Sequence, residues 1–194
     1  FRVGVLATTA LLGSSLLTLG AGFLGVRYDH RQLLIACASL MVATGVAFAL
    51  VDGYAILLVV AFAGTVNPSG GSVSVFVPLE HALLADTVDD KTRTRMFARY
   101  SLFGSLAGAV GALAAGLPDL AARSGVDQLG ALKAMFVLYA LLGLLGGLIY
   151  ARIPLQKPIS VGKSGAPLGP SRHIVYRLAA LFCIDSFAGG FTVQ

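Results

Sequence analysis

The sequence predicts an all-α, multi-pass membrane protein, and its composition and the spacing of its charges support this prediction. Of the 194 residues, 57% are hydrophobic and only 12% are charged, and the mean hydropathy is +0.86. Soluble domains carry about 25% charged residues, so a soluble chain of this composition would lack polar surface. Apolar runs of about 20 residues, the length that a helix needs to cross a bilayer, alternate with short charged segments.

Other classes of protein fit these residues less well. The net charge of +5 is scattered among apolar runs, which does not favour a nucleic-acid partner. Cys37 and Cys183 lie in apolar segments without metal-ligand spacing, so neither a metal nor another cofactor is predicted. No set of residues resembles a catalytic site, so the chain is not predicted to be an enzyme. The sequence starts and stops inside apolar runs, and we expect a fragment truncated at both ends.

Five spans and the start of a sixth follow one another along the chain. They cover residues 1–25, 32–51, 54–84, 100–117, 132–150 and the segment that begins at 174. The connections are the polar segment 22–31, a tight turn at Asp52 and Gly53, the charged segment 86–99, and the polar segment 118–130. Residues 152–172 are rich in Pro, Gly and Ser and are predicted to be a linker.

The third span is too long for a straight crossing. Its 31 residues would measure about 46 Å as one helix, against a hydrocarbon core of about 30 Å. Asn67 and Pro68, followed by Gly70 and Gly71, mark the weakest point. Two interpretations stay open here: a simple proline kink, or a broken helix whose restarted end lines a substrate path.

The basic residues fall mainly on one side of the predicted spans. When sides alternate, 11 of the 14 Lys and Arg lie in the segments 27–31, 91–99 and 152–177, and only Arg2, Arg123 and Lys133 lie opposite. Cytoplasmic loops of membrane proteins carry the excess of Lys and Arg. The sequence therefore predicts a cell-membrane protein with its charged loops in the cytoplasm.

Two connections resemble those of one known family. Residues 82–118 contain ALLAD, an R-x-R pair, and a glycine-rich helix that ends in GLP. This order is similar to the connection between the fourth and fifth helices of major facilitator superfamily transporters. The segment GFLGVRYDHRQLL resembles the family's loop between helices two and three, with Gly22, Leu24, Arg27 and Arg31 at matching positions. Val26 stands where the family has Asp, a residue thought to latch the two halves together, and Asp29 could substitute for it.

The resemblance implies an N-terminal helical bundle of this superfamily. Residues 1–152 would be helices two to six, 153–173 the cytoplasmic linker between the two halves, and 174–194 the start of helix seven. It implies a secondary active transporter in a lipid bilayer that moves a small-molecule substrate by alternating access, coupled to protons. The alternative is a multi-span membrane subunit that does not transport and has a structural or assembly role.

Two groups of candidate functional residues follow. Asp185, Asn67 and Glu80 lie within spans, where ionisable and polar side chains usually face a cavity or a partner. A carboxylate such as Asp185 could bind and release the coupled proton, or it could serve only structural pairing.

The second group is expected in cytoplasmic gating loops, and its alternative role is plain topology signalling. It comprises Gly22, Arg27, Asp29, Arg31, Asp86, Arg93 and Arg95. Separately, Gly104, Gly108, Ala112 and Gly116 form a stripe of small residues that favours close helix packing.

Overall fold

The computed structural model describes most of the chain in two compact units, Phe1–Pro158 and Ile159–Gln194. The described residues are 2–25, 28–66 and 74–153, together with His173, Tyr176, Arg177, residues 179–181 and Cys183. In the second unit these described residues are helical. The rest of this section concerns the first unit.

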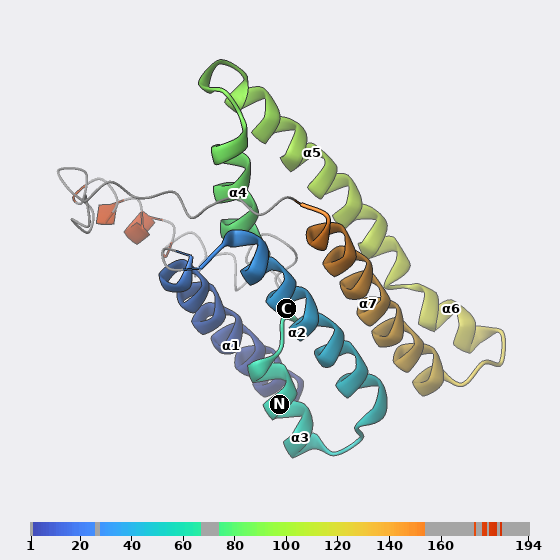
Figure 1. Cartoon of the computed structure of the whole chain (residues 1–194). Coiled ribbons are helices and arrows are strands. Elements are labelled where there is room, and N and C mark those ends of the chain that lie inside the picture. The colour runs from blue at the N-terminus through green and yellow to red at the C-terminus, as the bar shows by residue number, and fades with distance from the viewer. Residues whose placement is uncertain are drawn as a thin grey trace. The chain divides into compact units, whose positions relative to one another are not determined.

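Every regular element described in the first unit is an α-helix (Figure 1). The helices are α1 (Arg2–Leu24), α2 (His30–Leu50), α3 (Tyr54–Ala63), α4 (Phe76–Thr87), α5 (Asp90–Ala114), α6 (Leu117–Arg123) and α7 (Gln128–Ala151). Among the described residues, four stretches are long and apolar enough to cross a bilayer: Arg2–Leu24, His30–Leu50, Thr92–Arg123 and Gln128–Ala151. The predicted all-α, multi-pass fold is confirmed.

The long third span is divided between two short helices, α3 and α4. Helix α3 ends at Ala63, and Gly64 follows in an extended conformation; α4 begins only at Phe76. At 1.5 Å per residue the two short helices measure about 15 Å and 18 Å, so their break lies near the middle of a 30 Å core. Asn67 and the other residues expected to cause the break lie outside the described part of the chain.

The charged segment before the next span is helical, which corrects the predicted loop. Only Val88 and Asp89 separate α4 from α5, and Arg93 and Arg95 lie in the first turns of α5. Asp89 has an extended backbone at the N-cap position of α5. Lys and Arg are good helix formers. Helix α5 therefore includes the charged residues that precede its apolar stretch, and their backbone hydrogen bonds stay within the helix.

Helices α2 and α7 pack closely through glycine. A Cβ atom on Gly45 would lie 2.8 Å from the carbonyl oxygen of Phe136, and one on Gly143 would lie 3.0 Å from Cγ of Met41. Beside them the rings of Phe48 and Phe136 stack with centroids 4.9 Å apart. Small residues let two backbones approach, and this is the main source of helix attraction where both surfaces are apolar.

The glycine stripe predicted from the sequence has no such role in the described residues. A Cβ atom on Gly104 or Gly108 would meet nothing within 4 Å, whereas one on Gly13 of α1 would clash with the carbonyl oxygen of Phe62 in α3. The close approaches at glycines of the described residues thus include α2 with α7, α1 with α3, and Gly64 after α3 with Thr44 of α2.

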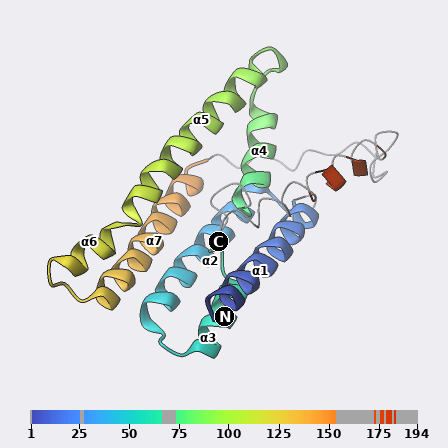
Figure 2. The same ribbon diagram turned by 180° about the vertical axis from the view of Figure 1, so that it is seen from behind.

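The helix ends form two groups at opposite ends of the first unit. The α1–α2 and α4–α5 connections and the end of α7 lie at one end, and the α2–α3 and α6–α7 connections at the other (Figures 1 and 2). At the first end, Arg31 Nη2 donates to the carbonyl oxygen of Ala151 at 2.7 Å. At the second, Lys133 Nζ lies 2.7 Å from Asp52 Oδ1. This grouping matches the alternation of sides used to count the charges.

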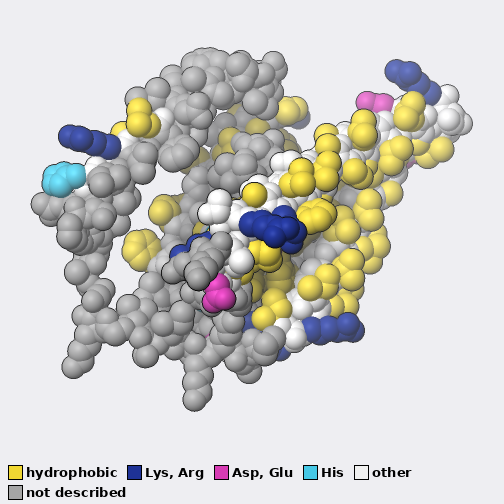
Figure 3. All heavy atoms as spheres, turned by 90° about the horizontal axis from the view of Figure 1, so that it is seen from above, with side chains coloured by type: hydrophobic (Ala, Val, Ile, Leu, Met, Phe, Trp, Pro, Cys, Tyr) yellow, Lys and Arg dark blue, Asp and Glu magenta, His cyan; other side chains and the backbone are white. Residues whose placement is uncertain are grey.

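The outer surface of the helices is apolar and the core is small. Leu34, Ala21, Val75 and Leu79 form a buried cluster where α1, α2 and α4 meet. Many large hydrophobic side chains remain exposed on the described helices, among them Leu113 of α5 at 80%. Figure 3 shows hydrophobic side chains gathered along the described helices, with charged groups few and separate. Such a surface suits lipid or other membrane helices.

The α2–α7 contact makes the substitution Gly45→Ala a test of the packing. We expect it to lower the free energy of unfolding of the full-length protein by about 1–3 kcal/mol, because the new methyl group meets the backbone of α7. The matched control is Gly146→Ala in α7, whose Cβ would sit in ordinary contact, 3.9 Å from the Tyr150 ring. Thermal unfolding in detergent measures both, and equal melting temperatures would contradict the described contact.

Candidate functional site

Two tyrosines from distant helices bind the carboxylate of Glu80. Tyr100 of α5 donates its hydroxyl to Oε2, and Tyr150 of α7 donates its hydroxyl to Oε1. The donors are 20 and 70 residues away from Glu80 in the sequence. All three side chains are half-buried. One carboxylate therefore ties together α4, α5 and α7.

The local sequence of α4 explains how Glu80 reaches this position. Val75 and Leu79 are buried in the core cluster and fix the short helix against α2. Phe76 and Glu80 are four residues apart, so they lie on the same face of the helix. The ring of Phe76 stacks on that of Tyr150, with centroids 6.2 Å apart. Tyr150 thus packs its ring against Phe76 while its hydroxyl reaches Glu80.

His81 holds the other tyrosine in place. Its ring meets those of Phe97 and Tyr100 edge to face, with centroids 5.1 Å and 5.2 Å apart. Both aromatic residues belong to α5, which shows no extensive packing against other described helices. The contacts with Glu80 and His81 therefore provide much of the described connection between α4 and α5.

A cavity of about 530 Å³ lies beside this cluster. Residues of α2, α4, α5 and α7 line it, together with Ser74 just before α4. Glu80, Tyr100 and Tyr150 form its polar wall, and Glu80 is the only charged side chain among its lining residues. The lining extends from Met41 and Leu142, which lie near the middle of α2 and α7, to Tyr150 near the end of α7.

The arrangement of Glu80 can bind a cation. A carboxylate has about four lone-pair positions, and the two tyrosine hydroxyls occupy two of them. The remaining positions can accept a proton or contact a positively charged group. A half-buried carboxylate with no cationic partner among the cavity-lining residues gains from either.

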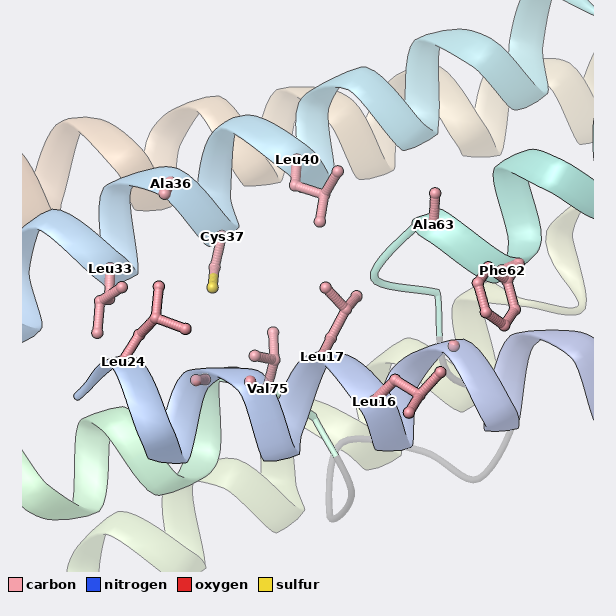
Figure 4. A pocket seen from close by; sticks show the side chains of 13 residues that line it. Leu16, Leu17, Leu24, Leu33, Ala36, Cys37, Leu40, Phe62, Ala63 and Val75 are labelled. Carbon is pink, nitrogen blue, oxygen red and sulfur yellow. The ribbon is translucent and has the colours of Figure 1, made fainter. Parts of the chain in front are cut away.

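A second cavity, of about 550 Å³, is almost entirely apolar. It lies between α1 and α2, with contributions from α3 and Val75 (Figure 4). Leu17 and Leu24 of α1 and Leu33, Cys37 and Leu40 of α2 are among the side chains that line it. It offers no charged group and no hydrogen-bonding set, so it lacks the chemistry of the Glu80 cavity.

A polar pair lies next to the break in the third span. Thr65 follows the end of α3, and its Oγ1 lies 2.8 Å from the hydroxyl of Tyr139 in α7. Thr65 is buried. This hydrogen bond joins the chain beside the break to α7.

The predicted gating residues at the first connection have structural partners. Asp29 is the N-cap of α2, where Oδ1 accepts from the backbone N–H of Arg31 at 2.9 Å. Arg31 lies in the first turn of α2 and reaches the end of α7. Gly22 is inside α1, and a Cβ there would meet nothing within 4 Å. Gly22 and Arg31 thus belong to helices and not to the predicted loop. Helix α1 continues to Leu24 and α2 starts at His30, so the connection between them is shorter than predicted.

The gating residues at the second connection also lie on helices. Arg93 Nη2 donates to the carbonyl oxygen of Ala85 in the last turn of α4 at 3.2 Å. Arg95 is exposed on α5, and Asp86 is in the last turn of α4, although its side chain is outside the described part. Arg27, Asn67 and Asp185 lie outside the described residues altogether.

Sequence reasoning identified Glu80 but missed its partners. Tyr100 and Tyr150 were assigned to the ends of two predicted spans, with no role of their own. A tyrosine at the end of a span usually suggests an interfacial anchor. What distinguishes Tyr100 and Tyr150 is that they lie at the same level of the bundle as Glu80. This is known only once the positions of the three helices are known.

A double-mutant cycle tests whether the Glu80 cluster stabilises the fold as a unit. For Glu80→Gln and Tyr150→Phe we expect a coupling energy of about 0.5–3 kcal/mol, because both changes remove the same charge-assisted hydrogen bond. Thermal or denaturant unfolding of the full-length protein gives the values. In the control cycle, Glu80→Gln with Tyr139→Phe, the effects should add within about 0.5 kcal/mol. Additivity in both cycles would refute the coupling.

Comparison with known proteins now bears on this architecture. The chain is 27% identical over 142 residues to the "Uncharacterized membrane protein YJR124C" of Saccharomyces cerevisiae, a match that covers 72% of this chain and 32% of the yeast protein. The chain thus spans about a third of the length of that relative. No solved structure matches it. The sequence pattern of the Major Facilitator Superfamily matches residues 1–193. This multi-pass helical membrane chain therefore belongs to the Major Facilitator Superfamily, a family of transporters.

Proposed function

We propose that the protein is a secondary active transporter that moves a small solute by alternating access and is coupled to protons. The observation that carries the proposal is the Glu80 carboxylate, bound by tyrosines of two other helices, at the edge of a cavity beside a broken helix. Transporters place substrate and ion sites near the bilayer midplane, often beside discontinuous helices. The family membership supports the same class of function.

The proposed organisation of the chain follows the family resemblance. Residues 1–152 would supply helices two to six of the first half, 153–173 the linker, and 174–194 the start of helix seven. The yeast relative is long enough for two such halves, since this match covers 32% of it. The basic helix ends, with Arg31 and Arg93, would face the cytoplasm of a cell membrane.

Glu80 is our candidate for the proton site in the described part of the chain. As a carboxylate it accepts hydrogen bonds from Tyr100 and Tyr150. A proton that binds one of its oxygens turns an acceptor into a donor, and the tyrosine hydroxyl on that oxygen loses a charged acceptor. Proton binding would therefore weaken the link between α4 and either α5 or α7. Asp185 and Asn67 stay candidates for the coupling and substrate path.

The gating proposal concerns Arg31 and Arg93. Each donates a hydrogen bond to a carbonyl oxygen in the last turn of a helix, Arg31 to Ala151 and Arg93 to Ala85. A cation favours the C-terminal end of a helix because the helix dipole is negative there. These two contacts fasten helix ends at the proposed cytoplasmic side, and we propose that they rearrange as the two halves rock, with Asp29, Asp86 and the other predicted gating residues.

Alternating access can be tested without knowing the solute. Ser74 lines the cavity, so in a full-length variant without other cysteines, Ser74→Cys should react with a membrane-impermeant maleimide from both sides of the membrane. The rates are measured in right-side-out and inside-out vesicles, at acidic and at alkaline pH. The control is Ser124→Cys, an exposed position after α6 that should react from one side only.

The outcomes separate the two functions considered for this chain. If the preferred side for Ser74→Cys changes with pH, and Glu80→Gln removes that change, then a proton-coupled carrier with Glu80 as the proton site is supported. If Asp185→Asn removes it instead, the coupling residue is Asp185. Reaction from one side under all conditions would favour a membrane subunit without transport.

A further inference from the structure

We infer that the cavity beside Glu80 binds an organic monocation, an apolar molecule with a single positive centre. The inference rests on the proposed function, because it names the chemical class of the transported solute. Three features of the described residues support it: the charge of the cavity, its aromatic wall, and the poverty of hydrogen-bonding groups elsewhere on its surface.

The charge of the cavity selects a cation. Its lining includes one carboxylate and no Lys, Arg or His. The hydroxyls of Tyr100 and Tyr150 give the carboxylate hydrogen bonds but no opposite charge. A charge withdrawn from water is costly unless it is paired. A positively charged ligand supplies the missing partner, whereas an anion would be repelled.

The aromatic wall suits a cation with weakly hydrated charge. Phe76, Tyr100 and Tyr150 line the cavity together with Glu80, and the rings of Phe76 and Tyr150 are stacked 6.2 Å apart. Cations lie favourably over the faces of aromatic rings, most of all when they are out of water. An aromatic group next to a carboxylate therefore offers two kinds of attraction to one positive centre.

The remaining walls exclude strongly polar solutes. Besides Glu80 and the two tyrosines, Ser74 is the one polar side chain of the lining, and its Oγ is already close to the backbone N–H of Phe76 at 3.3 Å. Met41, Val77 and Leu142 are among the apolar residues of the lining. A sugar would leave most of its hydroxyls unpaired there, at a cost for each. The volume, about 530 Å³, is in the usual range for small-molecule sites.

The test is a binding measurement with two ions of nearly the same shape and opposite charge. Tetraphenylphosphonium is an apolar monocation, and tetraphenylborate is its anionic counterpart. We expect the purified full-length protein in detergent to bind radiolabelled tetraphenylphosphonium at a saturable site, measured by equilibrium dialysis. Tetraphenylborate should not bind at that site, and it is assayed directly at a concentration too low for the two ions to pair.

Variants locate the site. Glu80→Gln should weaken tetraphenylphosphonium binding roughly tenfold or more, which corresponds to about 1.4 kcal/mol or more, and Glu80→Asp should retain part of the affinity. Tyr150→Phe should weaken it less, because the ring stays. Asp119→Asn, an acidic position on α6 outside the cavity lining, is the matched control and should leave binding unchanged. Melting temperatures confirm that each variant is folded.

Three results would overturn the inference. They are no binding to a folded wild-type protein, equal binding of the two ions, and binding that Glu80→Gln leaves unchanged. The first would mean that the cavity takes another solute or is filled by another segment of the full-length chain. None of them decides whether the protein is a carrier, because the two-sided reaction of Ser74→Cys reports on that separately. Conversely, tetraphenylphosphonium binding with one-sided labelling would support the cation site and refute the carrier.

Discussion

The structure depends on one constraint, that polar groups in hydrocarbon need partners within the protein. Backbone groups meet it through helices, which is why the described part of the chain is helical. The break between α3 and α4 is the main departure. Polar side chains gather around that departure, with Thr65 bonded to Tyr139 on one side and Glu80 bonded to two tyrosines on the other. The two hydrogen-bonded groups flank the break, with Thr65 just after α3 and Glu80 in the first turns of α4.

The same constraint explains how the helices are held together. Apolar side chains gain little by leaving lipid, so helix contacts need close backbone approach or hydrogen bonds. The α2–α7 and α1–α3 contacts use close approach at Gly45, Gly143 and Gly13. Helix α5 has no comparable glycine contact in the described chain, and Glu80 and His81 link it to α4. The glycine contacts hold α1 to α3 and α2 to α7, while α4 and α5 are joined by polar and aromatic contacts of Glu80, His81 and Arg93.

Much of the fold could be predicted because composition alone fixes where a chain can lie in a membrane. The spans and the break near Asn67 follow from run length and from Pro and Gly. The packing partners could not be predicted: Gly45 and Gly143 make close contacts, whereas the more regular stripe at Gly104 and Gly108 makes none among the described residues. A stripe of small residues allows a second helix to pack closely against it, but the stripe does not determine whether a second helix lies there. The prediction of a charged loop was wrong. Lys and Arg favour a helix, so α5 already begins at Asp90, before the apolar run.

The candidate site could also be predicted only in part, because its residues come from three separate helices. Glu80 could be singled out because a carboxylate in a span is costly, but its partners come from segments 20 and 70 residues away. Because these partners belong to different helices, a ligand that changes the charge of the carboxylate would change the strength of hydrogen bonds between helices. The proposed proton or cation would act in this way on the contacts of α4 with α5 and α7. A carboxylate shared among three helices beside a cavity would couple ligand binding to helix packing, and the proposed carrier requires such a coupling.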